Sequence, residues 1–228
     1  MIATTPLVEL PGEVRDLALR LGASEKCAGS IVTLEQRGTM RAAPSASPMQ
    51  FTARQTIATE AVEFEWRAKC GPFGALSVTD YLRADSWGVR VRLLGLIPIA
   101  TSVDSPAAMK GETMRYLAEL PWAPDAILSN SRLVWRVVNA HSFAVSSRDG
   151  VGEVILRLSP DGLVAAIEAK DRPQIEGDVT VERPWQGEFS DYQCFEGRTV
   201  PTRGEVSWIL PTGAFKTWEG EVTGWSLH

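Results

Sequence analysis

Residues that bind metals or form disulfides are scarce in this sequence. Its 228 residues include 3 Cys, at Cys27, Cys70 and Cys194, and 2 His, at His141 and His228. The cysteines form no Cys-x-x-Cys pair, and a zinc site needs several Cys or His ligands, so neither a zinc ribbon nor a disulfide framework is indicated. We interpret the cysteines as buried structural thiols and expect no bound metal and no cofactor.

Motifs of several enzyme classes are also absent. The chain has no Gly-x-Ser-x-Gly nucleophile elbow and no glycine-rich phosphate loop, which argues against Ser/His/Asp hydrolysis and nucleotide binding. Its 23 Lys and Arg residues are scattered among 28 Asp and Glu residues, and the formal net charge is -5. Nucleic-acid binding favours a basic block, so we expect no nucleic-acid partner. Together, these absences argue against an enzyme.

Long apolar runs are missing as well. No segment approaches the roughly 20 apolar residues of a membrane span, and the N-terminus lacks the basic and apolar regions of a signal peptide. We therefore expect a cytoplasmic protein without a membrane span. The hydrophobic content of 44% is ordinary for a globular protein, and no stretch resembles a flexible linker. A single domain over residues 1–228 is the prediction.

Alternating apolar residues are the strongest pattern that is present. Phe64 and Trp66 alternate with charged neighbours, which is typical of a half-buried strand. Trp185 and Phe189 share one parity, and short turns such as Glu196-Gly197 separate successive strands. Two blocks of strands are predicted, over residues 31–99 and 132–227. Asp171-Arg172-Pro173 is interpreted as a loop at the end of a strand.

Two helices interrupt these strands. Leu10-Pro11-Gly12 opens a short helix over residues 10–22, and Ser105-Pro106 caps a longer one over residues 105–120. A large sheet has an apolar face to cover, and the longer helix is the obvious cover. The predicted fold is mainly β: a large, strongly curled antiparallel sheet, or open half-barrel. The long helix packs on its concave side, and a short helix precedes the sheet.

A set of short motifs carries a resemblance to a known family. They are Gly-Glu-Thr-Met-Arg-Tyr-Leu-Ala-Glu at 111–119, Trp-Ala-Pro at 122–124, Asp-Arg at 171–172, Pro-Trp-Gln-Gly at 184–187 and Val-Pro-Thr-Arg-Gly-Glu-Val-Ser-Trp at 200–208. In these motifs the chain resembles an uncharacterised bacterial family known only as a domain of unknown function. The resemblance implies no activity. It implies a fold similar to the lipoprotein-carrier half-barrel (LolA/LolB-like) and, through that fold, an apolar ligand.

A charged stripe on the long helix is open to three interpretations. Glu112, Arg115 and Glu119 lie three and four residues apart, so Arg115 can pair with either carboxylate. The stripe is a solvated charge ladder, a polar rim at the mouth of a pocket, or a source of catalytic carboxylates. The last requires an acid that is buried and unpaired.

A second charged pair flanks Gly204. Arg203 and Glu205 share a strand face, so they are expected to pair with each other or with the helix stripe at the join between helix and sheet. Gly204 marks a bulge or a close approach of the backbone.

The first functional hypothesis is a binding protein for a hydrophobic or amphipathic small molecule, similar to a lipid or fatty acid. Tyr116, Leu120, Trp122 and Trp208 would line a pocket between sheet and helix, and Arg115 would meet a ligand carboxylate. Trp122 lies in a proline-flanked break, which favours a pocket wall or a lid.

Two alternatives from other classes stay open. One is an enzyme that uses Glu112, Glu119 or Glu205 as a general base. The other is an interaction module that binds a protein through the outer sheet face or an edge. The predicted ligand-binding residues are Arg115, Tyr116, Glu119, Leu120, Trp122, Arg203, Glu205 and Trp208.

Overall fold

The computed structural model describes residues 10–24, 29–176 and 179–228. All strands of these residues join one antiparallel sheet of 13 strands, in the order β6-β5-β4-β3-β2-β1-β13-β12-β11-β10-β9-β8-β7. The strands of the first block are β1 (Ile31–Met40), β2 (Met49–Ala58), β3 (Phe64–Cys70), β4 (Leu76–Arg83), β5 (Ser86–Leu93) and β6 (Ile97–Val103). Those of the second block are β7 (Leu133–Asn139), β8 (Ser142–Ser147), β9 (Glu153–Leu158), β10 (Val164–Glu176), β11 (Val179–Phe195), β12 (Arg198–Leu210) and β13 (Gly213–Leu227).

Each block is a meander, and the two meanders meet through the first and last strands. β1 pairs with β13 from Val32 opposite Leu227 to Met40 opposite Trp218. This pairing joins the beginning of the sheet to the end of the chain. The edges of the sheet are therefore β6 and β7, on either side of the helices that connect the blocks.

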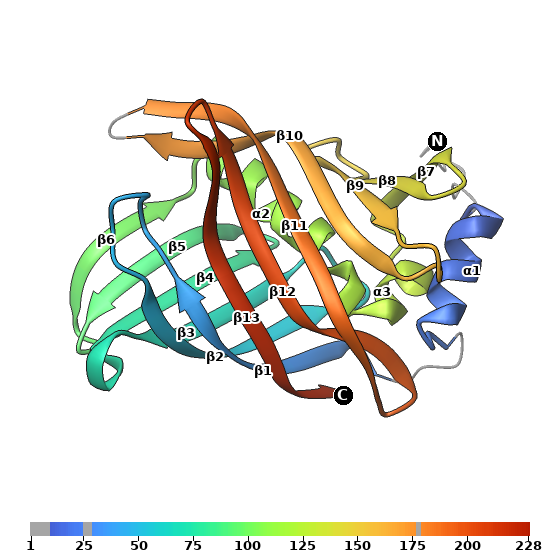
Figure 1. The fold of residues 1–228 in the computed structure, drawn as a ribbon, viewed down its shortest axis with the longest axis horizontal. Coiled ribbons are helices and arrows are strands. Elements are labelled where there is room, and N and C mark those ends of the chain that lie inside the picture. The colour runs from blue at the N-terminus through green and yellow to red at the C-terminus, as the bar shows by residue number, and fades with distance from the viewer. Residues whose placement is uncertain (1–9, 25–28, 177–178) are drawn as a thin grey trace, which may run out of the picture.

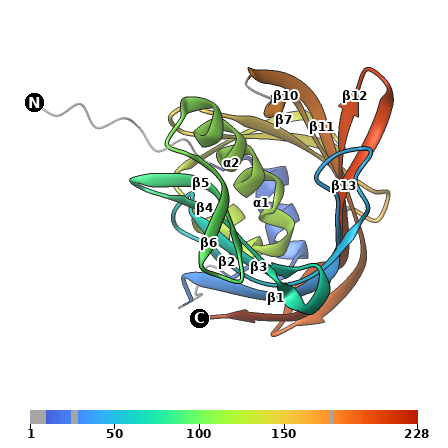
Figure 2. The same cartoon turned by 90° about the vertical axis from the view of Figure 1, so that its left-hand side faces the viewer.

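Helix α2 (Pro106–Ala118) contacts both flanks of the curled sheet, β4 and β5 on one side and β8 to β10 on the other. Figure 2 shows the sheet curling around this helix. The hydroxyl of Ser105 accepts a hydrogen bond from the amide of Ala108 at 3.0 Å, as expected of an N-cap followed by proline. The predicted half-barrel with a helix on its concave side is confirmed.

The remaining helical elements are short. They are α1 (Gly12–Arg20), α3 (Pro124–Ser129) and the 3-10 turns η1 (Pro72–Gly74) and η2 (Leu120–Trp122). In Figure 1, α1 and α3 lie together at one end of the half-barrel, which we call the helix end. The β3–β4 and β5–β6 connections and the adjoining ends of β10 and β11 lie at the other end, which we call the hairpin end.

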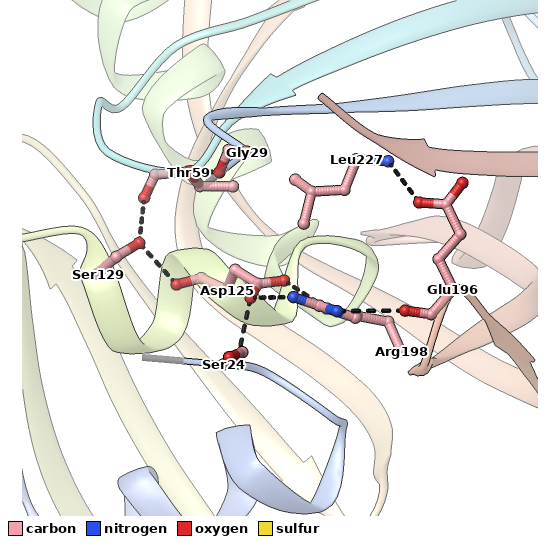
Figure 3. A network of polar contacts seen from close by, with 8 residues as sticks. All are labelled: Ser24, Gly29, Thr59, Asp125, Ser129, Glu196, Arg198 and Leu227. Carbon is pink, nitrogen blue, oxygen red and sulfur yellow. Dashed lines mark hydrogen bonds and ion pairs between the residues drawn. The ribbon is translucent and has the colours of Figure 1, made fainter. Parts of the chain in front are cut away.

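A buried ion pair ties the helix end together (Figure 3). Asp125 of α3 accepts hydrogen bonds from Arg198 of β12, at 2.9 and 3.1 Å, and from the amide of Ser24, at 3.1 Å. The hydroxyl of Ser129 donates to the carbonyl of Thr59 at 3.1 Å. Asp125 is 1% exposed, so its charge is stabilised by these donors rather than by water.

Three expectations need correction. Cys70 is a buried thiol as expected, but Cys194 is exposed because it lies near the tip of the β11–β12 hairpin, beyond the core; Cys27 lies outside the described residues. The first block of strands extends to Val103 rather than 99. Asp171-Arg172-Pro173 is no loop, because β10 continues through it with a shift of register between Ala169 and Arg172.

Candidate functional site

The most unusual feature of the interior is a charged cluster under α2. Asp80 comes from β4, Glu112 and Arg115 come from α2, Glu119 caps the C-terminus of α2, and Arg172 comes from β10. The cluster therefore spans both flanks of the sheet. The three carboxylates are between 6% and 9% exposed. Acidic side chains are rarely buried to this extent unless they are paired, so each partner is of interest.

Arg115 is the paired centre of the cluster. Its guanidinium contacts the carboxylate of Asp80 and donates to Oε1 of Glu119 at 2.8 Å. The same group lies over the rings of Phe64 and Trp66, with centroids at 4.9 and 5.3 Å. Such stacking on aromatic faces suits a planar guanidinium that is removed from water.

Glutamine side chains extend this network across the sheet. Gln55 donates to Glu119 and accepts from Gln36 at 3.3 Å. The indole of Trp66 donates in turn to Gln36 at 2.8 Å. The half of the cluster around Glu119 is therefore satisfied, with a hydrogen-bond partner at each step.

The other half of the cluster, around Arg172, lacks such a complete set of partners among the residues described. Its guanidinium lies over Trp185 and Trp208, with ring centroids at 4.4 and 5.3 Å, and Nε donates to the carbonyl of Gly111 at 3.3 Å. No ion pair joins Arg172 to another described residue, although Arg172 is partly buried. Burial holds the pKa of Arg172 below its usual value. It is a cation in the interior without a bonded carboxylate.

Unpartnered polar atoms mark the same region. Oδ1 of Asp80, Oε2 of Glu112 and Nε1 of Trp185 are buried, and none has a hydrogen-bond partner among the described residues. Buried polar atoms are nearly always hydrogen-bonded, and leaving one unpaired costs about 1–3 kcal/mol. The indole N–H of Trp185 is therefore available to a polar group that is not part of this chain, whereas Asp80 and Glu112 lie close enough to share a hydrogen bond when Glu112 carries a proton.

Glu112 is also unlike an ordinary surface acid. Burial raises the pKa of Glu112 well above its usual value, and the neighbouring Asp80 raises it further, while Arg172 and Arg115 oppose the shift. Burial likewise raises the pKa of Glu119, which Arg115 and Gln55 oppose. A neutral Glu112 places no full negative charge beside Arg172.

The predicted residues on α2 and just beyond it do share one region. Leu120 is fully buried, and the hydroxyl of Tyr116 donates to the carbonyl of Ala58 at 2.8 Å and accepts from Asn130 at 2.8 Å. Trp122 lies within η2, buried, where its indole donates to the carbonyl of Pro201 at 2.9 Å. These bonds fix Trp122 in the core, whereas a lid would be exposed and free to move.

Arg203 and Glu205 do not meet the helix, and the expectation that they do is wrong. Arg203 pairs with Asp191 at 2.8 Å on the outer face, where the two side chains are 65% and 58% exposed, and Glu205 pairs with Lys216 there. Alternation places Gly204 inward instead. A Cβ at Gly204 would lie 3.1 Å from the ring of Trp122, so the predicted close approach of the backbone is confirmed.

Sequence reasoning missed Asp80 and misplaced Arg172. Asp80 occupies an inward position of β4 between two apolar inward residues, Val78 and Leu82. An acid in an apolar inward series indicates a buried charged site, and this signal could have identified Asp80. Arg172 belongs to the recognised Asp-Arg motif, but its direction depends on the register shift in β10. No local pattern predicts that shift.

Apolar side chains remain accessible at the hairpin end. Five inward-facing residues there are only partly buried: Met40, Leu76, Val78, Val206 and Trp218. The loops and strand ends around them expose Phe73, Leu94, Leu96, Ile175 and Val179. At the helix end, inward-facing Leu34, Ile57 and Phe64 are buried. The concave face is therefore apolar and partly open to solvent beside the unpaired half of the cluster.

Comparisons with known proteins match the fold rather than a reaction. The model of a family of unknown function, DUF6544, matches residues 2–220. Among solved structures, a LolA superfamily protein from Nitrosomonas europaea is similar with a TM-score of 0.52 and 10% identity, over 97% of this chain and 94% of that one. A domain described as an outer membrane lipoprotein-sorting protein, from Vibrio parahaemolyticus, has a TM-score of 0.50 and 11% identity, over 95% and 91%. The fold is therefore LolA-like.

Searches for a curated relative and, in the part of the chain that the structure describes, for a metal site and a membrane-spanning helix gave no positive result. A search of curated proteins finds no match. Within the described residues, no group of three or more His, Cys, Asp or Glu side chains is placed to hold a metal ion. In the same part of the chain, every helix is too short or too polar to cross a membrane.

Proposed function

We propose that the chain, which belongs to the DUF6544 family of unknown function, binds a hydrophobic or amphipathic small molecule of the lipid or fatty-acid kind. The observation that carries the proposal is the Arg172 guanidinium, partly buried, stacked on Trp185 and Trp208, and without an ion-pair partner in the described chain. A carboxylate or phosphate head would supply the missing partner.

The apolar surroundings suit the rest of such a ligand. Arg172 lies on the part of β10 that leads to the hairpin end, where Leu76, Val78, Val206 and Trp218 face inward and stay partly accessible. Pockets for small molecules are mostly apolar with a few polar anchors, which is the balance here. Each buried methylene of a ligand chain contributes about 0.8 kcal/mol.

The anchor differs from the one that the sequence predicts. Arg115 already contacts Asp80 and Glu119, so a ligand carboxylate at Arg115 would have to displace one of them. Arg172 needs no such exchange. The raised pKa of Glu112 supports the same assignment, because a neutral carboxyl that shares its proton with Asp80 does not repel an anionic head.

The experiment is native mass spectrometry together with displacement of a fluorescent fatty acid by oleate. Wild-type protein should bind with measurable affinity, and Arg172→Gln should weaken binding at least tenfold. Arg157→Gln is the matched control, because Arg157 of β9 is an exposed arginine paired with Glu168 of β10. Absence of any fatty-acid complex, or equal weakening in both variants, would overturn the proposal.

One observation favours a second candidate, an enzyme with Glu112 as general acid or base. Glu112 is buried without an ion pair in the described residues, and its pKa is raised, as in several catalytic carboxyl groups. A panel of p-nitrophenyl esters and glycosides tests it against Glu112→Gln. Turnover that disappears in the variant supports an enzyme; no turnover, or turnover unchanged in Glu112→Gln, removes this candidate.

A further inference from the structure

The outer face of β3, β4 and β5 carries a hollow of about 310 Å³ that is separate from the interior site. Four arginines line it, Arg67, Arg83, Arg90 and Arg92, and Glu65 is its one acidic lining residue among those described. The chain has a net charge of -5, whereas this hollow, with four arginines and one glutamate, is locally positive. Such reversals attract anions.

The register of the strands fixes these arginines around a common centre. Arg67 of β3 lies opposite Thr79 of β4, and Thr79 lies opposite Arg90 of β5, so two cations flank one hydroxyl. Neighbouring strands lie about 4.8 Å apart, which puts the two arginine backbones about 10 Å from each other. Arg92 follows in the next outward position of β5. An oxyanion fits between side chains that approach from both strands.

Two of the four arginines have no acidic partner. Glu65 pairs with Arg67 at 2.7 Å and contacts Arg83, whereas Arg90 and Arg92 form no ion pair with any described residue. The guanidinium of Arg90 lies over the ring of Tyr81, 4.9 Å from its centroid, and that of Arg83 at 5.4 Å. The aromatic ring therefore orders two of the cations before any ligand arrives.

Tyr81 supplies an independent sign of a missing ligand. It lines the hollow, is 2% exposed, and its hydroxyl has no hydrogen-bond partner among the described residues. A buried tyrosine hydroxyl ordinarily has a partner. The residue opposite Tyr81 on β5 is Gly88, which has no side chain to supply one. A ligand oxygen would accept this proton.

We propose that this hollow binds an oxyanion of the phosphate class, held by Arg90 and Arg92 and by the Tyr81 hydroxyl. Guanidinium groups form paired, charge-assisted hydrogen bonds with phosphate oxygens, which a carboxylate-poor hollow leaves available. The phosphate belongs either to a soluble molecule or to a phospholipid headgroup. The β5–β6 connection beside the hollow exposes Leu94 and Leu96, which a headgroup source would place against a lipid surface.

The first arm of the test uses inorganic phosphate and isothermal titration calorimetry in a phosphate-free buffer of low ionic strength. Wild-type protein should bind, the double variant Arg90→Gln/Arg92→Gln should bind at least tenfold more weakly, and Tyr81→Phe at least threefold more weakly. Arg136→Gln, at an exposed arginine on β7, should bind like wild type. Circular dichroism verifies that all four proteins are folded.

The second arm uses sedimentation with vesicles of phosphatidylglycerol mixed with phosphatidylcholine, against phosphatidylcholine alone. Binding to the anionic vesicles that is lost in the double arginine variant, and weakened by Leu94→Ser/Leu96→Ser, identifies a headgroup as the source. Phosphate binding without vesicle binding identifies a soluble anion. The proposal is overturned when neither probe binds, or when the double variant and Arg136→Gln behave alike with the probe that does.

Discussion

Two buried ionic clusters among the described residues differ in whether the chain itself completes them. At the helix end, Asp125 accepts hydrogen bonds from Nε and Nη2 of Arg198 and from the amide of Ser24. Under α2, the indole N–H of Trp185 has no hydrogen-bond partner and Arg172 has no ion pair in the described part of the chain. Complete clusters fix structure, whereas an incomplete one carries a desolvation cost that binding can relieve. We therefore predict that the first cluster mainly stabilises the fold, and that the second is the proposed ligand site.

Breaking the complete cluster should produce the largest loss of stability. Asp125→Ala leaves Arg198 buried without its carboxylate, and an arginine cannot release its proton to escape. We expect the free energy of unfolding to fall by about 3–5 kcal/mol. Urea denaturation measures it, with Glu168→Ala in an exposed pair as the control that should lose less than about 1 kcal/mol. Equal losses would mean that Asp125 is an ordinary surface acid.

Removing the cation from the cluster under α2 should cost somewhat less. Arg115→Met leaves Asp80 and Glu119 without their partner, but burial raises the pKa of Glu119, so Glu119 is able to take up a proton. The expected loss at neutral pH is therefore near the lower end of the range for a broken buried pair, about 3 kcal/mol, and it should shrink as the pH falls. Urea denaturation at pH 7 and pH 5 tests this, and a loss that does not change with pH would contradict it.

The pH dependence of Glu112 sharpens the comparison further. Its folded pKa is raised, so the folded protein holds a proton that the unfolded chain releases above its ordinary pKa of about 4.3. Its contribution to stability is therefore present below that pH and is lost as the pH rises towards the folded pKa, by up to about 1.4 kcal/mol per pH unit. Glu112→Gln cannot titrate. Its stability relative to wild type should rise between pH 5 and pH 8, and a constant difference would show that Glu112 is ionised when folded.

The smallest effect should come from the outer pair that the sequence places at the helix. Arg203 is mostly exposed and pairs with Asp191, so Arg203→Ala should lower the free energy of unfolding by less than about 1 kcal/mol. Arg67→Ala, on the outer face of β3, is the matched comparison and should behave alike. A loss of several kcal/mol at Arg203 alone would restore the expectation that it supports the helix.

Patterns of alternation explain how much of this fold the sequence predicts. In β3 and β11, Trp66 and Trp185 mark the inward faces, and Ser105-Pro106 predicts the start of α2. The two blocks of strands and the helix between them predict the curled, covered sheet, but alternation does not show that β1 pairs with β13, so the strand order could not be predicted.

The candidate site was harder to predict because its members meet only after the sheet curls. Arg115 and Glu119 are neighbours on one helix, and their pairing follows from spacing alone. Asp80 and Arg172 reach the helix from opposite flanks, which depends on the strand order and on the register shift in β10. Arg203 was misplaced for another reason: alternation with inward-facing Val206 and Trp208 already places it outward, and the expected pairing with the helix did not follow that pattern.

Photolabelling would test most directly whether the incomplete cluster is a ligand site. Wild-type protein is irradiated with a diazirine fatty acid, and the labelled peptides are identified by mass spectrometry. We expect label on inward-facing residues of the hairpin end, such as Leu76, Val206 and Trp218, and its loss in Arg172→Gln but not in Arg157→Gln. Label that falls only on the outer sheet face, or that persists unchanged in Arg172→Gln, would contradict a ligand held by Arg172.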